Sequence, residues 1–181
     1  MTKSDHTYPD ISFIRQSVEA GGVTKHELMQ RLHQSAIRLN EYANKLLMDQ
    51  HFLISETPYQ VEVIALTVKE LGFPEGTVTA ALYKKADELE LTLCPIELGP
   101  FLRLAYTEQE EHVSHKKNQA PAGSMTIASE PLYDRGDFPK GFYLRRKDGE
   151  LWLRGYSADH LHVWNPEDVF IFCVKGKGNT E

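Results

Sequence analysis

The chain has 181 residues, of which 41% are hydrophobic and 25% are charged, and its formal net charge is −6. This composition is typical of a folded globular protein and excludes a disordered one. The negative balance disfavours duplex DNA and anionic membranes as partners unless basic residues cluster locally. No signal peptide is evident, and no segment approaches the roughly 20 apolar residues of a membrane span. We therefore expect a cytoplasmic protein without a membrane partner.

Residues 11–90 carry mainly helical signals. The clearest is the spacing of Thr24 and Glu27, which is that of a capping box at a helix start. Segment 57–71 also alternates like a strand, but Gly72 and Pro74 follow it as a helix terminator, so we predict a helix there. Further helices are expected over about 11–20, 40–47 and 77–90.

Residues 91–176 carry mainly extended signals. The runs "LTLCP" and "FLRLAY" suit short strands, although Pro95 would also permit a helical turn between them. Segment 107–124 is polar and is expected to be a loop, and segment 124–129 a strand. Asp148-Gly149 suits a type I′ turn between two strands, and the fully apolar "DVFIFCV" belongs in the middle of a sheet.

These signals predict an α+β fold. A helical N-terminal half (11–90) is expected to pack with a small, mainly antiparallel C-terminal β-sheet (91–176) as one compact unit. The two cysteines, Cys94 and Cys173, each lie in an apolar run, and we expect two buried thiols. A disulfide between them would need an oxidising compartment.

The strongest candidate site is one face of the hairpin "GFYLRRKDGELWLRGY" (141–156). Alternation places Phe142, Leu144 and Leu153 on the core face. The opposite face carries aromatic and basic residues: Tyr143, Arg145, Trp152, Arg154 and Tyr156. Such residues are enriched at binding hot spots and also stack on unpaired bases, so the expected partner is a protein or single-stranded nucleic acid. Alternatively, the N-terminal helices cover Trp152, and the arginines pair with Glu150, Asp148 and Asp159 across the strands.

A hydrolase is the second hypothesis. Its candidate acid is Glu97, which lies between apolar residues, with Asp134 and Asp137 as further carboxylates. His160-x-His162 would place two imidazoles on one strand face as a partial metal site, although its spacing lacks the paired ligand doublets of structural zinc sites. We expect no cofactor, because neither a phosphate-binding loop nor a dinucleotide fingerprint is present.

A third hypothesis is DNA binding. Residues 24–50 have the outline of a helix-turn-helix, but they lack the expected basic footprint.

The strings "LTLCPIELGPFLRLAY", "FYLRRKDGELWLRGY" and "WNPEDVFIF" carry a resemblance. They resemble a family of uncharacterised bacterial proteins from Bacillus-like genomes, which share L-C-P-x-E-x-G-P-x-L-R-L and W-x-P-D-D-x-F-V-F elements. The resemblance covers most of residues 22–174. Some members are loosely labelled as helicases, but this chain has no Gly-x-x-x-x-Gly-Lys-Ser/Thr loop and is too short for two motor domains. The resemblance therefore implies an architecture and no activity.

Overall fold

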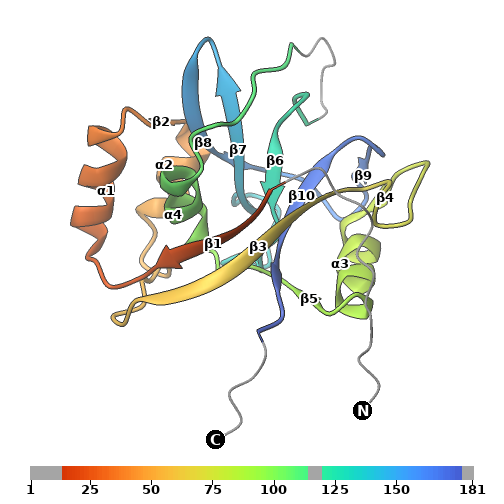
Figure 1. Ribbon diagram of the computed structural model, residues 1–181, viewed down its shortest axis with the longest axis horizontal. Coiled ribbons are helices and arrows are strands. Elements are labelled where there is room, and N and C mark those ends of the chain that lie inside the picture. Colours follow the sequence, from red (N-terminus) through yellow and green to blue (C-terminus); the bar gives the residue numbers. More distant parts are fainter. Residues whose placement is uncertain (1–13, 114–119, 177–181) are drawn as a thin grey trace, which may run out of the picture.

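The computed structural model describes residues 14–113 and 120–176 (Figure 1). The described residues form ten strands and four short helices, in the order β1 (Arg15–Ala20), α1 (Lys25–Gln34), β2 (Arg38–Leu39), α2 (Glu41–Leu47), β3 (Tyr59–Thr67), β4 (Thr77–Val78), α3 (Thr79–Glu88), β5 (Leu91–Thr92), α4 (Leu98–Ala105), β6 (Met125–Ile127), β7 (Gly141–Lys147), β8 (Glu150–Tyr156), β9 (Val163–Trp164) and β10 (Val169–Val174).

A large curled sheet organises the molecule. Its strand order is β1-β3-β10-β6-β7-β8-β2, and β5 also pairs with β10. The pairing is antiparallel except between β10 and β6 and between β2 and β8. Strands β4 and β9 form a separate two-stranded sheet. Strands from both halves of the chain therefore share one sheet, with β3 and β10 side by side near its middle (Figure 1).

The predicted fold class is wrong, because the N-terminal half is not mainly helical. The expected helix over 11–20 is strand β1, as far as it lies within the described residues, and the expected helix over 57–71 is strand β3. Strand β3 pairs with β1 on one side and β10 on the other, so its backbone groups are satisfied by long-range partners. Those partners override the local helix signals, as tertiary context often does.

The terminator after β3 is nonetheless real. Gly72 has a φ of 102°, its N–H donates to the Lys69 carbonyl (2.9 Å), and the Phe73 N–H donates to the Val68 carbonyl (3.2 Å). This is a Schellman motif, which closes a single helical turn that follows the strand. Gly72 therefore does end helical backbone, but this backbone is a single turn. The residues before Val68 form strand β3 and not the expected helix.

The segment "FLRLAY" is also not extended. It forms most of helix α4, which buries Leu98, Phe101 and Leu102 on the core side. Their spacing of three and four residues is that of a helical face. The fully buried Arg103 lies on the same helix and donates hydrogen bonds to Gln109 and to the carbonyls of Trp152 and Tyr106.

Other local predictions are confirmed. Thr24 and Glu27 form the capping box that begins α1, and Asn40 caps α2. Asp148 and Gly149 both have positive φ (54° and 75°), as a type I′ turn requires. The apolar strand β10 lies between β3 and β6 inside the sheet.

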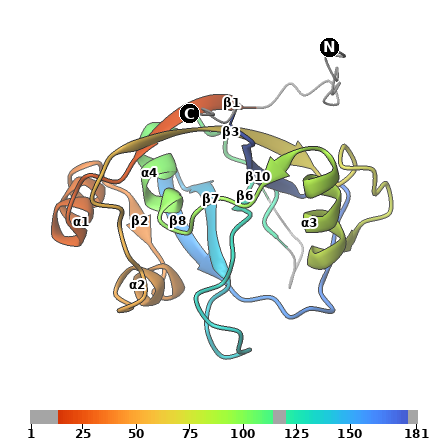
Figure 2. The same cartoon turned by 90° about the horizontal axis from the view of Figure 1, so that it is seen from below.

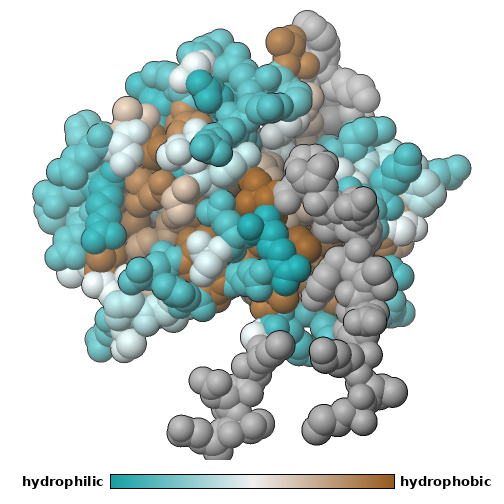
Figure 3. Space-filling model, in the orientation of Figure 1, coloured by the Kyte–Doolittle hydropathy of each residue, from teal (hydrophilic) through white to brown (hydrophobic). Residues whose placement is uncertain are grey.

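The two faces of the sheet are covered differently. Helices α1, α2 and α4 lie on one side with the larger core, whereas α3 lies on the other side above a smaller core that includes Phe170 and Phe172 (Figure 2). The outward side of α1 is hydrophilic (Figure 3), as expected for an amphipathic helix that buries Leu28 and Leu32. In the described part of the chain, no helix combines the length and apolarity needed to cross a bilayer.

Candidate functional site

Four side chains at the edge of the sheet form an arginine–aromatic ladder: Arg38, Trp152, Arg154 and Tyr143. The guanidinium carbon of Arg38 lies 5.6 Å from the Trp152 ring, and that of Arg154 lies 5.0 Å from the same ring on the β8 strand. Arg154 also lies 5.8 Å from the Tyr143 ring, its cross-strand partner on β7. Cations and rings therefore alternate, which is a favourable arrangement for guanidinium groups.

The hairpin arginines lack acidic partners among the described residues. Among the described residues, Arg145 and Arg154 make no ion pair and no side-chain hydrogen bond, and their Nε atoms are buried without a partner. Arg146 lies on the opposite face of the hairpin, where it donates to the Gln109 carbonyl (3.4 Å). The one ion pair of the ladder joins Arg38 to Glu150 at 3.5 Å, with both side chains about half exposed. The alternative that the hairpin arginines pair across the strands is not what the structure has.

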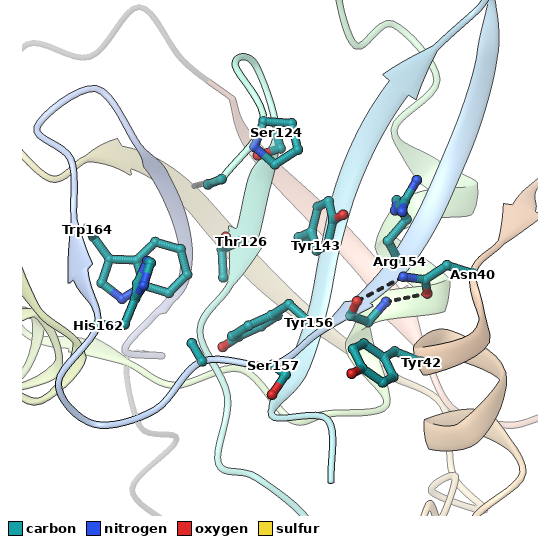
Figure 4. Close-up of a pocket in the computed structure, with 14 residues that line it drawn as sticks. Asn40, Tyr42, Ser124, Thr126, Tyr143, Arg154, Tyr156, Ser157, His162 and Trp164 are labelled. Atoms are coloured by element: carbon teal, nitrogen blue, oxygen red, sulfur yellow. Dashed lines mark hydrogen bonds between the residues drawn. The ribbon is translucent and has the colours of Figure 1, made fainter. Parts of the chain in front are cut away.

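A pocket of about 570 Å³ opens beside the ladder and shares Tyr143 and Arg154 with it (Figure 4). Thr126, Tyr143 and Tyr156 come from the neighbouring strands β6, β7 and β8. Figure 4 shows Tyr42 and Arg154 on one side of these residues and His162 with Trp164 on the other. The volume is within the range of natural ligand pockets.

The aromatic side of the pocket is rigid. Trp164 is 4% exposed, donates its Nε1–H to the Thr79 hydroxyl (2.9 Å), and packs edge-on against His162 and Tyr156. Burial raises the pKa of Tyr156 well above its ordinary value, and the hydrogen bond with Tyr83 raises it further. Tyr156 therefore stays neutral at physiological pH and offers a ring rather than a base.

Two hydroxyl groups in the pocket have no partner. Ser124 and Thr126 are only 5% and 4% exposed. Within the described residues their hydroxyls make no hydrogen bond, and they do not belong to the polar atoms that are shut off from solvent. Both residues line the pocket, so their hydroxyls are free to bond a ligand there.

One wall of the pocket depends on how α2 is placed. Asn40 donates through Nδ2 to the Gly155 carbonyl (3.0 Å) and accepts through Oδ1 from the Gly155 N–H (2.8 Å). A Cβ atom on Gly155 would lie 2.6 Å from the Tyr42 carbonyl carbon and 2.8 Å from the Ala43 nitrogen. Glycine at position 155 therefore lets α2 approach β8, and this approach places Tyr42 at the pocket.

Glu97 is used structurally. It is 6% exposed, and its carboxylate accepts hydrogen bonds from the Ser55 N–H (2.8 Å), the Ser55 hydroxyl (2.7 Å) and the Tyr59 hydroxyl (2.8 Å). These bonds tie the start of α4 to the chain that enters β3. Burial and the bond to Glu97 raise the pKa of Tyr59, so the phenol remains a donor. Glu97 belongs with the larger core, whereas the pocket lies on the opposite face of the sheet.

The remaining hydrolase candidates lie apart from Glu97. Asp134, His160 and His162 line a polar depression of about 610 Å³ together with Asp159. Asp137 instead pairs with Arg135 at 3.1 Å. His160 lies in a turn and only His162 adjoins a strand, so the expected shared strand face does not form. No group of three or more potential metal ligands is found in the described ranges.

The helix pair at 24–50 is attached to the sheet through the short strand that lies between the two helices. Strand β2 follows α1 and pairs with β8, and α2 comes directly after it. Polar side chains of the second helix have partners within the protein: Asn44 donates to the Asn40 carbonyl (3.3 Å) and Lys45 to the Asp137 carbonyl (3.5 Å).

The two cysteines are free, buried and near each other. The Cys94 thiol donates to the Ile171 carbonyl (3.7 Å) on β10, the strand that carries Cys173. Burial raises the pKa of Cys94 well above its ordinary value, and the hydrogen bond between the two thiols lowers that of Cys173.

Comparisons with protein-family models, with curated proteins and with solved structures find no match for this chain. The resemblance to bacterial proteins stays a prediction.

Sequence reasoning found Tyr143, Arg154 and Tyr156 but missed the residues that reach the site from elsewhere. Arg38 comes from a two-residue strand, Thr126 from the three-residue strand β6, and Ser124 from the position directly before β6. Trp164 joins them because β9 pairs with β4, far away in sequence. No local pattern marks these residues, because only long-range pairing brings them together.

Proposed function

We propose that this protein is a non-enzymatic binding module that recognises an anionic partner through the arginine–aromatic ladder. The observation that carries the proposal is the Arg154 guanidinium, which lies over two rings while making no hydrogen bond or ion pair among the described residues. Cation–π contacts hold the plane of a guanidinium and leave its N–H edges free. Such edges match the geometry of carboxylate or phosphate.

The surroundings support the same role. Trp152 and the hairpin arginines are partly exposed, and they are among the residue types most enriched at binding hot spots. The chain as a whole carries a net charge of −6, so a cluster in which Arg145 and Arg154 have no carboxylate partner among the described residues is a local exception. The cytoplasmic location expected from the sequence is part of this proposal.

The test is binding to two flexible polyanions, polyglutamate and a 12-residue oligothymidylate, measured by fluorescence anisotropy at low salt. Wild type should bind at least one of them, and the double variant Trp152→Ala/Arg154→Ala should bind it at least about tenfold more weakly. Arg31→Ala, which removes an exposed arginine on α1 outside the ladder, is the matched control and should behave as wild type. Binding of neither polymer, or equal binding by a folded double variant, would exclude the proposed role.

A further inference from the structure

We propose that the partner of the ladder is single-stranded nucleic acid and that the pocket receives one of its bases. This inference rests on the proposed function, because the pocket and the ladder share Tyr143 and Arg154. Because Arg154 lines the pocket and also lies over the Trp152 ring, a polymer with one unit in the pocket can continue along β8 over Trp152 towards Arg38.

The pocket suits a planar ring with polar edges. Aromatic side chains from three elements surround it: Tyr42 on α2, Tyr143 on β7 and His162 next to β9. The hydroxyls of Ser124 and Thr126 each can donate and accept, and neither has a partner among the described residues. Nucleobases combine a stacking face with donors and acceptors on the edge, and unpaired bases are recognised by this combination.

The ladder suits the phosphates that accompany the base. Arg38, Arg145 and Arg154 lie on neighbouring positions of β2, β7 and β8 on one face of the sheet, and only Arg38 has a carboxylate partner in the described part of the chain. From residue 152 to residue 156 the strand advances by roughly 13 Å. This distance is several times the roughly 3.4 Å rise per nucleotide of a duplex strand, which leaves room for more than one nucleotide of a more extended single strand.

Two competing partners fit less well. An acidic peptide would satisfy the arginines, but its carboxylates would leave the unpartnered hydroxyls in the aromatic pocket unused. A duplex presents phosphates, but its bases are stacked and paired and would have to be flipped out to enter the pocket. Both partners are therefore arms of the test.

The first measurement varies only the ligand, so it does not depend on any variant folding. Fluorescence anisotropy of wild-type protein compares five ligands: oligothymidylate, an abasic strand of the same length, the corresponding duplex, thymidine monophosphate as a competitor, and polyglutamate. We expect the oligothymidylate to bind at least tenfold more tightly than the abasic strand and the duplex, because base stacking contributes roughly 5- to 150-fold per base. The monophosphate should compete only weakly, because it leaves most of the ladder unoccupied.

The second measurement distinguishes contacts with the base from contacts with the phosphates. Thr126→Val removes a pocket hydroxyl at nearly constant volume and should weaken oligothymidylate a few-fold while leaving the abasic strand unchanged. Arg154→Ala should weaken both strands. Contacts from the three arginines Arg38, Arg145 and Arg154 predict a slope of about −2 for the logarithm of the binding constant against the logarithm of salt, and Arg154→Ala should reduce its magnitude by about 0.7. Circular dichroism and thermal melts establish that each variant is folded.

The outcomes separate the two proposals. Binding of polyglutamate without binding of oligothymidylate would overturn the nucleic-acid inference and leave the proposed function standing. Equal affinity for oligothymidylate and the abasic strand, or for oligothymidylate and the duplex, would overturn the base pocket. Binding of no anionic polymer would overturn both.

Discussion

Gly155→Ala is expected to destabilise the protein through the contact between α2 and β8. The new Cβ would lie 2.6 Å from a backbone carbon of Tyr42 and 2.8 Å from the Ala43 nitrogen, so a helix rather than a flexible side chain has to move. Overpacking of this kind costs about 1–3 kcal/mol. Movement of α2 also weakens the two hydrogen bonds between Asn40 and Gly155, each worth about 1 kcal/mol.

The expected loss is therefore about 2–4 kcal/mol in the free energy of unfolding, measured by urea denaturation. For a chain of this size each kcal/mol lowers Tm by about 2–4 °C, so the Tm of Gly155→Ala should be lower than that of wild type by roughly 4–15 °C. Gly136→Ala is the matched control, because a Cβ at that exposed position meets no atom within 4 Å and should leave Tm unchanged. A Gly155→Ala protein that melts within about 1 °C of wild type would refute the proposed contact.

Three further outcomes are expected. Glu97→Gln should lower the free energy of unfolding by about 1–3 kcal/mol, because an amide NH2 would face the donors that now bond the carboxylate; unchanged stability would contradict a structural role. Burial raises the pKa of Asp49, but hydrogen bonds from the His51 backbone and the Tyr133 hydroxyl outweigh it and leave that pKa below its ordinary value of 3.8. The stability that this carboxylate supplies is present above pH 3.8 and is lost as the pH falls through the lowered pKa. Asp49→Asn should therefore have a lower free energy of unfolding than wild type at pH 7, and this difference should shrink in acid. A difference that does not change with pH would contradict the lowered pKa. Cys94 and Cys173 should react with Ellman's reagent only after denaturation, because both thiols are buried; rapid reaction of the native protein would contradict their burial.

The sequence predicted those elements whose signals are local. The capping box at Thr24, the type I′ turn at Asp148-Gly149 and the alternation of the hairpin each depend on residues within a few positions of one another. The prediction for β3 failed because the helix-termination signal that follows it is local, whereas its strand partners, β1 and β10, lie elsewhere in the chain. The composition of a segment cannot reveal such partners.

The candidate site divides in the same way. Alternation along β7 and β8 correctly placed Tyr143, Arg154 and Tyr156 on the face away from the larger core, and that face stays partly exposed. The apolar neighbours of Glu97 predicted its burial, and the His160-x-His162 spacing predicted a shared strand face, but the structure places Glu97 and His160 in unrelated surroundings. The pocket itself needed the arrangement of β6, β9 and α2 around the hairpin, which no spacing in the sequence encodes.

The position of β10 has a consequence for how the chain folds. Val169 pairs with Thr67 on one side and with Met125 on the other, so the middle of the sheet is filled by a segment that is synthesised well after both of its neighbours. Contacts of such large sequence separation slow folding, because the chain must close long loops before any pairing stabilises it. During translation β3 waits with an unpaired edge until residues 169–174 leave the ribosome, and that interval is when the nascent chain is most exposed to aggregation.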